Sequence, residues 1–219
     1  MAPAPTSSPG SSLSFRTFCG EWVTALAAGL NRQKWVVFSF IAVILLTGGV
    51  ERAMGRSLLG PDGKFGWWEG GIWSNECSQR FADPYSLSHV AHGMVFYGGL
   101  WLVARRLPVR RRFLLAVLLE AGWEVLENSP LIIERYRQVT IALGYDGDSV
   151  LNSLSDVFMM SLGFLLALRF RPWITVAGLA AMELGCALWI HDNLTLNIIM
   201  LVHPVEAIKA WQMTGRPPL

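Results

Sequence analysis

Apolar residues occur along this chain in runs that are about as long as a membrane is thick. The main windows lie at about 35–50, 86–104, 113–131, 150–168 and 173–191, with a shorter one at about 194–208 that is interrupted at His203 and Pro204. A transmembrane helix needs roughly 20 mostly apolar residues. The pattern therefore predicts an all-α, polytopic helical membrane protein with six transmembrane helices, of which the sixth is short or broken.

The segments outside these windows complete the predicted organisation. Residues 1–14, MAPAPTSSPGSSLS, lack the apolar run of a signal peptide and predict a disordered tail. Apolar residues then recur at three- and four-residue spacing, which predicts an amphipathic helix over 15–34 on the cytoplasmic membrane surface. The alternative is that this segment extends the first span. The transmembrane domain then covers 35–211, and 212–219 form a C-terminal tail.

Composition supports a membrane location. The chain is 53% hydrophobic and only 16% charged, with ten tryptophans, whereas soluble domains average about 45–50% apolar and about 25% charged residues. The three cysteines, Cys19, Cys77 and Cys186, fall in different predicted compartments and offer no disulfide framework. The net charge of +2 indicates no nucleic-acid partner, because the positions of the basic residues are explained by membrane topology.

Basic residues favour the cytoplasmic side of membrane proteins and so indicate the orientation. With the N-terminus inside, the inner segments hold twelve Lys and Arg residues, among them the run RRLPVRRR at 105–112, and the outer segments hold six. This predicts a multi-pass membrane protein with a cytoplasmic N-terminus. The segments 51–85 and 132–149 then lie outside. The first of these is long enough for a lid, and its Trp67 and Trp68 are expected to anchor it among lipid headgroups.

Polar residues inside the predicted spans carry the candidate chemistry. They share helix faces within three stretches, namely His89 and His92 in SLSHVAHG, Glu120, Glu124 and Glu127 in FLLAVLLEAGWEVLE, and Asp148, Asn152 and Asp156 in DSVLNSLSD. The topology brings most of them to the outer leaflet, with Glu120, Asp156 and Glu183 deeper. The sequence therefore predicts an outward-opening polar cavity with catalytic candidates His89, His92, Glu124, Glu127, Asp148, Asn152 and Asp156.

Other polar residues at the same predicted level are candidates for substrate binding. They are two arginines of the outer loop and two residues around the end of the fifth span, namely Arg135, Arg137, His191 and Asn197. Structural alternatives remain open for several positions. Asn152, Asn197 and Glu183 suit hydrogen bonds between packed helices, and Asp148 suits a helix N-cap.

The acids need neutralisation. The predicted spans contain Glu120, Glu124, Glu127, Asp156 and Glu183 but no Lys or Arg, and an ionised carboxylate at the middle of a bilayer costs at least about 2.5 kcal/mol. Protonation, the histidines, an arginine from the outer loop or a bound cation would each meet this need. Two histidines with several carboxylates suit a divalent metal such as Zn²⁺ or Mn²⁺, with His89, His92, Glu124, Glu127 and Asp148 as ligands, although no metal-binding motif such as HExxH is present.

Three functions are compatible with this pattern. The first is an enzyme or binder that acts on a lipid or a lipid-linked envelope precursor, with membrane lipids as its surroundings. The second is an ion- or proton-coupled transporter, in which the same acids titrate along the cavity. The third is a non-catalytic membrane assembly factor whose polar centre is structural. A single outward cavity argues against alternating access, whereas a fully paired network without a pocket would favour the third function.

Several long strings resemble known families. FADPYSLSHVAHGMVFYGG, LLEAGWEVLENSPLIIERYR, GYDGDSVLNSLSDV and HDNLTLN are similar to an uncharacterised family of multi-pass inner-membrane proteins from alphaproteobacteria. That resemblance implies a membrane location and no particular activity. A shorter pattern is similar to VanZ-like membrane proteins, some of which are linked to glycopeptide-antibiotic resistance, and it comprises Asp83, His89, Glu120 or Glu124, Arg137, Asp148, Asn152 and Gly163. The extra acids Glu127 and Asp156 depart from that pattern.

Overall fold

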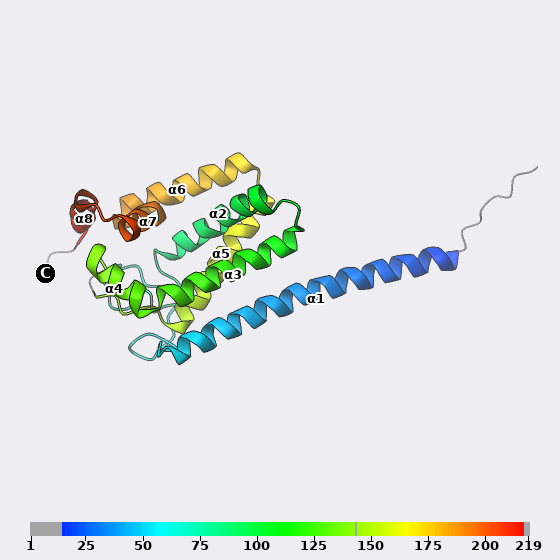
Figure 1. The fold of residues 1–219 in the computed structure, drawn as a ribbon, viewed down its shortest axis with the longest axis horizontal. Helices are drawn as coiled ribbons and strands as arrows, with labels where there is room; N and C mark the ends of the chain where they lie inside the picture. The colour runs from blue at the N-terminus through cyan, green and yellow to red at the C-terminus, as the bar shows by residue number, and fades with distance from the viewer. Residues whose placement is uncertain (1–14, 143, 217–219) are drawn as a thin grey trace, which may run out of the picture. The chain divides into compact units, whose positions relative to one another are not determined.

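A computed structural model describes the backbone of residues 15–142 and 144–216 and the side chains from residue 33 onward. Within this described part the secondary structure is helical, which confirms the predicted all-α class (Figure 1). The helices are α1 (Phe15–Ala53), α2 (Ser86–Ala104), α3 (Val109–Glu127), α4 (Pro130–Val139), α5 (Val150–Arg169), α6 (Pro172–Ile190), α7 (Leu194–Val202) and α8 (Glu206–Met213). The predicted tail over 1–14 lies outside the described residues.

The first helix is longer than the first predicted span. α1 runs without a break from Phe15 to Ala53, so the segment 15–34 and the first span form one helix, which is the alternative that the sequence left open. The chain divides into two compact units, 1–39 and 40–219, and the first contains the beginning of α1. A position of that segment on the membrane surface stays a prediction.

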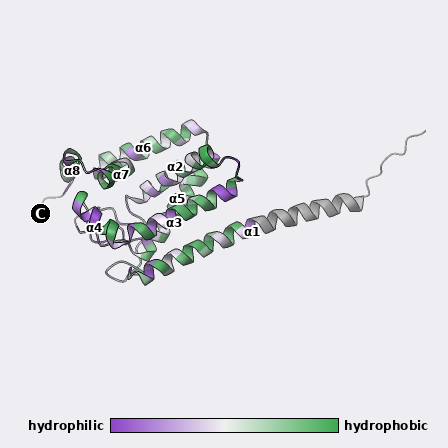
Figure 2. Ribbon diagram, in the orientation of Figure 1, coloured by the Kyte–Doolittle hydropathy of each residue, from purple (hydrophilic) through white to green (hydrophobic). Residues whose placement is uncertain are grey.

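Four helices are long and apolar enough to cross a membrane. They contain the segments Gln33–Ala53, Ser86–Ala104, Val150–Arg169 and Pro172–Ile190, and apolar positions recur along their ribbons (Figure 2). Local sequence explains where two of them begin. Ser149 caps α5 by accepting a hydrogen bond from the Asn152 amide, and Pro172 occupies the first turn of α6, where its missing N–H removes no helical hydrogen bond.

The predicted count of six spans is not confirmed. α3 has 19 residues, the same length as α2, but it begins with three arginines and carries three glutamates. α7 has only nine residues. At 1.5 Å per residue it extends about 14 Å, roughly half of the hydrocarbon core. The interruption at His203 and Pro204 therefore ends a short helix that is unable to span.

The chain folds back after α7. Arg135 on α4 donates through Nε and Nη2 to the Leu201 carbonyl oxygen, at 3.0 and 2.9 Å, and Lys209 Nζ donates to the Gln138 carbonyl oxygen at 2.9 Å. The guanidinium of Arg216 lies 5.6 Å from the ring centre of Trp73 in the 54–85 loop. α8 therefore lies with α4 and the 54–85 loop, whereas a sixth full span would put it with the 105–112 run.

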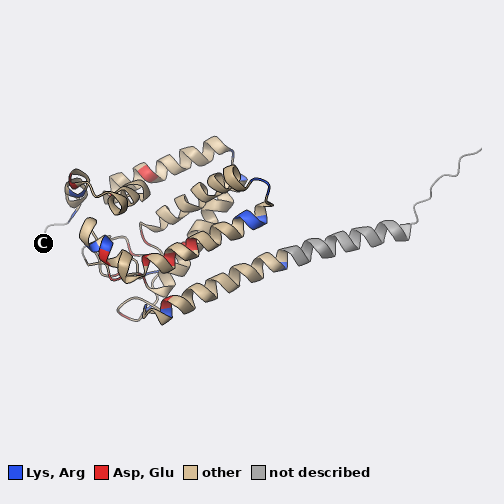
Figure 3. Ribbon diagram, in the orientation of Figure 1, with Lys and Arg blue, Asp and Glu red and all other residues tan. Residues whose placement is uncertain are grey.

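Charge is divided between the two ends of the helices. The basic residues of the α2–α3 connection lie at one end of α3, and the acidic residues of α3 lie further along it (Figure 3). Arg105, Arg106, Arg110 and Arg111 are all exposed. The exposed basic end and the acidic end thus face opposite ends of the bundle, as the sequence predicted.

The closest helix crossing joins α2 and α5. A Cβ atom on Gly93 would overlap the Met160 carbonyl oxygen, and one on Gly163 would overlap the Val90 carbonyl oxygen. Small residues at such crossings let two backbones approach closely, which is the main source of packing between helices in a membrane. Beside this crossing lies the apolar core, formed by Ala116, Val117, Val157, Met160 and Phe164.

Substituting either crossing glycine is expected to destabilise the bundle. Gly93→Ala or Gly163→Ala places a methyl group against backbone, so the free energy of unfolding in detergent should fall by at least about 1–3 kcal/mol, the range for overpacking. Gly98→Ala is the matched control, because Gly98 lies on α2 and a Cβ added there would meet no atom within 4 Å. Equal melting temperatures for Gly93→Ala and Gly98→Ala would contradict the close crossing.

The fold-back of α7 predicts the side on which α8 ends. In a background without the three native cysteines, Pro61→Cys and Thr214→Cys are expected to react with the same membrane-impermeant maleimide in sealed vesicles. Arg106→Cys should react only in vesicles of the opposite orientation, because it lies at the other end of the helices. If Thr214→Cys instead reacted only in the vesicles in which Arg106→Cys reacts, the result would support the predicted sixth span.

Candidate histidine–carboxylate centre

Two histidines of α2 meet one glutamate of α3. His89 and His92 lie one turn apart, and their rings are 5.1 Å apart in an edge-on arrangement. His89 Nδ1 lies 2.7 Å from Glu120 Oε1, and His92 Nδ1 lies 2.9 Å from the same oxygen. Glu120 is fully buried. The predicted pair of histidines is therefore held by the first of the three acids that share a face of α3.

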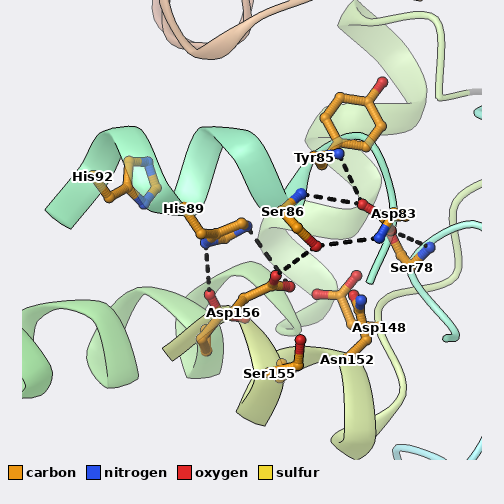
Figure 4. Close-up of polar contacts among 12 residues, drawn as sticks. Ser78, Asp83, Tyr85, Ser86, His89, His92, Asp148, Asn152, Ser155 and Asp156 are labelled. Atoms are coloured by element: carbon orange, nitrogen blue, oxygen red, sulfur yellow. Dashed lines mark hydrogen bonds and ion pairs between the residues drawn. The ribbon is translucent and has the colours of Figure 1, made fainter. Parts of the chain in front are cut away.

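A third helix supplies Asp156. Its Oδ2 lies 3.7 Å from His89 Nε2, and its Oδ1 accepts a hydrogen bond of 3.4 Å from the Ser86 hydroxyl (Figure 4). His89 thus faces Glu120 with one ring nitrogen and Asp156 with the other. The spacing of 3.7 Å is too long for a direct hydrogen bond.

Glu124 has the most unusual environment of the site. It lies one turn after Glu120, its side chain is 0% exposed, and Oε1 is 3.4 Å from His89 Nδ1. In the described part of the chain neither carboxylate oxygen has a hydrogen-bond partner. A buried carboxylate in this state carries its full desolvation cost. This carboxylate needs a ligand or a proton.

Asp148 closes the far side of the site from the loop before α5. Its Oδ1 accepts from the Tyr145 hydroxyl at 2.9 Å, and its Oδ2 accepts from the Asn128 amide at 3.0 Å. The side-chain Oδ1 of Asn128 in turn accepts from the Asp148 backbone N–H at 2.7 Å. Burial raises the pKa of Asp148 to about 6, and the hydrogen bond from Tyr145 opposes this shift. Asn128 and Tyr145 therefore position Asp148, a role that side-chain spacing alone did not indicate.

Asn152 lies beside this loop and contacts the backbone. Its Nδ2 donates to the Arg80 carbonyl oxygen at 2.9 Å, the Ser149 hydroxyl donates to the Gln79 carbonyl oxygen at 3.1 Å, and the Ser155 hydroxyl donates to the Phe81 carbonyl oxygen. These bonds fix the end of the 54–85 loop against the start of α5. Asn152 thus orders the end of this loop, a contact with loop backbone and not with another packed helix.

The end of that loop also sets the start of α2. Asp83 is buried and accepts backbone N–H bonds from Ser78 at 2.8 Å, Tyr85 at 2.8 Å and Ser86 at 3.3 Å. Burial raises the pKa of its carboxyl group, and these hydrogen bonds oppose the shift. By fixing the first turn of α2, Asp83 determines where His89 points (Figure 4).

The donor atoms of the centre form three groups, in each of which all donors lie within 4.8 Å of one another. The groups are His89, His92 and Glu120, then His89, Glu124 and Asp156, then Glu124, Glu127 and Asp148. They contain no Lys or Arg. Imidazole and carboxylate donors suit Zn²⁺, Mn²⁺ and related divalent ions. Six of the seven predicted catalytic residues belong to these groups, and Asn152 does not.

One buried acid near this site was missed. Glu51 on α1 is 0% exposed, and both of its oxygens lack a hydrogen-bond partner among the described residues. It stands one residue beyond the first apolar window, so the hydropathy pattern groups it with the outer loop. Its position in the predicted topology could have revealed it, because the end of the first span lies at the same depth in the membrane as the other acids.

The four predicted substrate-binding residues have different contact partners. Arg135 ties α4 to the Leu201 carbonyl oxygen, and His191 ends α6 in a left-handed conformation with its ring 5.0 Å from that of Trp211. Asn197 donates to Asp192 at 3.4 Å. Arg137 lines a hollow of about 240 Å³ together with Arg56, Pro130, Ile133, Glu134 and Asp146. None of the residues that line this hollow belongs to the histidine–carboxylate groups.

Asp192 joins the C-terminal segment to α2. Its buried carboxylate accepts from the Asn193 backbone N–H at 2.9 Å, the Gln212 amide at 2.9 Å, the Tyr85 hydroxyl at 3.2 Å and the Asn197 amide at 3.4 Å. Burial raises the pKa of Asp192 to about 6 even though these donors oppose the shift. This connection holds α8 beside the N-terminal end of α2.

The fold and the site define a helical membrane protein with a buried histidine–carboxylate centre. The chain belongs to the family described as "Protein of unknown function (DUF2585)", whose model matches residues 52–214. Membership confirms the predicted resemblance to an uncharacterised family, whose relatives here come from alphaproteobacteria. The resemblance to VanZ-like proteins stays a prediction. No solved structure gives a significant match.

Three curated relatives show how far the similarity extends. A UPF0314 protein of Sphingopyxis alaskensis is 47% identical over 194 residues, which cover 87% of this chain and 100% of the relative. UPF0314 protein RL4541 of Rhizobium johnstonii is 48% identical, with coverage of 83% and 93%. A UPF0314 protein of Paracoccus denitrificans is 50% identical, with coverage of 73% and 82%. The similarity therefore includes the whole histidine–carboxylate centre.

Stability is expected to depend on the protonation of Asp192. Because its folded pKa of about 6 exceeds the ordinary value of 3.8, the folded state binds the proton more tightly. The contribution of this group is complete below about pH 4 and is lost as the pH rises through 6, by up to about 3 kcal/mol. Relative to wild type, Asp192→Asn should become progressively more stable between these pH values in detergent melts.

Asp62 provides the control for this pH series. Hydrogen bonding from Arg80 lowers the pKa of the Asp62 carboxyl, so Asp62→Asn should show a trend of opposite sign, and a small one because the group is solvent-exposed. A constant stability difference between wild type and Asp192→Asn from pH 4 to 7 would contradict the assigned role of Asp192.

Proposed function

We propose that this protein binds a divalent metal ion between His89, Glu124 and Asp156 and uses it to hydrolyse, or transfer a group on, a lipid or envelope precursor. The observation that carries the proposal is the Glu124 carboxylate, which is fully buried and has no hydrogen-bond donor among the described residues. A cation held by these donors would balance the charge of the Glu124 and Asp156 carboxylates, for which the imidazole of His89 is the basic side chain in the same group.

The distances around His89 support a metal ion. Tetrahedral ligands at about 2.0–2.1 Å from a zinc ion lie roughly 3.3 Å apart. His89 Nε2 and Asp156 Oδ2 are 3.7 Å apart, which is too far for a hydrogen bond and close to that ligand spacing. The other nitrogen, Nδ1, lies 2.7 Å from Glu120. Metal-ligating histidines commonly donate their second N–H to a carboxylate, which fixes the tautomer and the ring orientation.

Glu124 also belongs to the group with Glu127 and Asp148. Because its two oxygens are both free of hydrogen bonds from the described residues, the same carboxylate is able to serve both groups. A bridging carboxylate between two cations is typical of hydrolytic centres with two metals about 3.5–4 Å apart. A bound divalent cation would polarise the substrate and lower the pKa of a bound water. His92, which is held by Glu120 and is 16% exposed, is the candidate general base.

Five membrane spans fit both the helices and the charges. These are α1, α2, α3, α5 and α6, with α7 and α8 returning along the end that holds α4. With Lys209 and Arg216 moved to the outer side, ten basic residues remain inside and eight lie outside. The positive-inside rule thus supports a cytoplasmic N-terminus, which would put the centre at the outer leaflet of the inner membrane.

The VanZ-like pattern adds support of a different kind. Its residues Asp83, His89, Glu124 and Asp148 all lie in or beside the centre, and Gly163 forms the crossing that brings α5 to α2. The pattern therefore corresponds to one physical site. Arg137 is the exception, because it lies in the separate hollow.

Metal content tests the proposal directly. The full-length protein, purified in detergent and dialysed, is expected to retain about one or more equivalents of Zn²⁺ or Mn²⁺ in elemental analysis. Glu124→Gln removes the shared negative charge and should lower the retained metal at least roughly tenfold, since losing even a residue that only supports a metal ligand costs about 10–100-fold in affinity. Metal-dependent release of phosphate or fatty acid from a panel of envelope lipids should fall in parallel.

Glu183→Gln is the matched control. Glu183 is also a glutamate within a membrane helix, but its carboxylate caps α7 by accepting from the Leu194 and Thr195 backbone N–H groups. This variant should keep the metal of the wild type. A wild-type protein without stoichiometric metal would rule out the metal enzyme and favour protonated acids, as in a proton-coupled carrier.

A further inference from the structure

The hollow beside α4 combines two arginines with an exposed opening. Arg56 follows the end of α1, and Arg137 lies in the last turn of α4. Arg137 Nε donates to the Tyr145 carbonyl oxygen at 2.6 Å, and its Nη2 pairs with Asp146, which also accepts from Arg56 Nη1 through its backbone carbonyl oxygen. The two guanidinium groups, about 80 residues apart in sequence, therefore converge on one exposed residue.

The hydrogen bonding of Arg56 is incomplete. Its Nε is buried and has no partner within the described ranges. Gly147 sets the position of its guanidinium, because a Cβ there would overlap Arg56 Nη1 and the residue has a positive φ of 89°. A side chain at 147 is thus excluded by both space and backbone conformation. The loop is shaped to keep the Arg56 guanidinium against its backbone.

Two acidic residues, Glu134 and Asp146, line the hollow, and Asp146 is the one that pairs with Arg137. The Asp146 side chain is 84% exposed, and its pair with Arg137 is open to solvent. Exposed ion pairs contribute little to stability. A ligand that carries more charge and more acceptor oxygens than a carboxylate is therefore able to displace Asp146. Phosphate groups meet this description, and the arginine fork matches them bidentately.

We propose that this hollow binds a phosphate group, either free or in the headgroup of a lipid. A volume of about 240 Å³ is smaller than the roughly 300–1,000 Å³ that holds a drug-sized molecule, so it accommodates a headgroup rather than a whole lipid. One residue, Gly147, separates Asp146 at the hollow from Asp148 at the histidine–carboxylate centre. The assignment of this phosphate to a substrate rests on the proposed function, whereas phosphate binding itself does not.

Calorimetric titration of the full-length protein in detergent tests the site with two probes. The probes are inorganic phosphate and dioctanoyl phosphatidic acid, which present the same anion free and on a lipid. Arg56→Gln and Arg137→Gln should each weaken binding about tenfold or more, because each removes a charge-assisted hydrogen-bond donor. Asp146→Asn should tighten binding severalfold, since it removes the competing carboxylate from an exposed position and leaves the fold unchanged.

Arg171→Gln is the matched control, since it removes an exposed arginine at the start of α6, remote from the hollow. It should bind both probes as the wild type does. Tighter binding of phosphatidic acid than of inorganic phosphate would identify a lipid as the ligand, and equal binding would identify free phosphate. Binding of neither probe, or binding unaffected by all three hollow variants, would overturn the proposal.

Metal analysis of the same samples separates this inference from the proposed function. The two arginine variants and Asp146→Asn should retain metal at the wild-type level, because their side chains lie outside the three donor groups. Arginine-dependent phosphate binding by a metal-free protein would support the phosphate site and contradict the proposed metal enzyme. Metal retention without arginine-dependent binding would do the reverse.

Discussion

The placement of Glu124 among other acids is the constraint on which the rest of the site depends. A buried carboxylate without hydrogen-bond donors persists only where the surrounding groups are held rigidly. If those groups could move, the carboxylate would reach water or a hydrogen-bond partner. Here α2, α3 and α5 supply those groups through His89, Glu120 and Asp156. The packing of these helices therefore determines both the helix crossing and the positions of the reactive groups of the centre.

The Gly93–Gly163 crossing shows how packing sets the donor geometry. Gly93 lies one turn after His89 on α2, and Gly163 lies two turns after Asp156 on α5. Because backbone meets backbone at this crossing, the two side chains approach each other to 3.7 Å without a larger residue between them. A wider crossing would leave His89 Nε2 too far from Asp156 for both to hold one ion.

The sequence was sufficient for features that depend on local periodicity. The one-turn spacing of His89 and His92 and the shared face of the α3 acids follow from 3.6 residues per turn, and both appear in the structure. Periodicity shows which helix face a residue lies on but not what it contacts. The role of Asn152, which donates to the Arg80 carbonyl oxygen, therefore stays open in the sequence. The count of six spans from hydropathy is not confirmed either, because α7 is apolar but only nine residues long.

The features that stayed hidden depend on segments distant in sequence. Arg56 meets Asp146 across 90 residues, and no spacing rule connects a residue after the first span with a loop before α5. The same loop contributes to both sites. Asp148 belongs to the carboxylates of the centre, and Asp146 contacts the two arginines of the hollow. A cation bound in the centre and an anion bound in the hollow would attract each other across a few ångströms of low-dielectric protein. Each would therefore lower the electrostatic cost of binding the other. By linkage, each ligand would then strengthen binding of the other to the same degree.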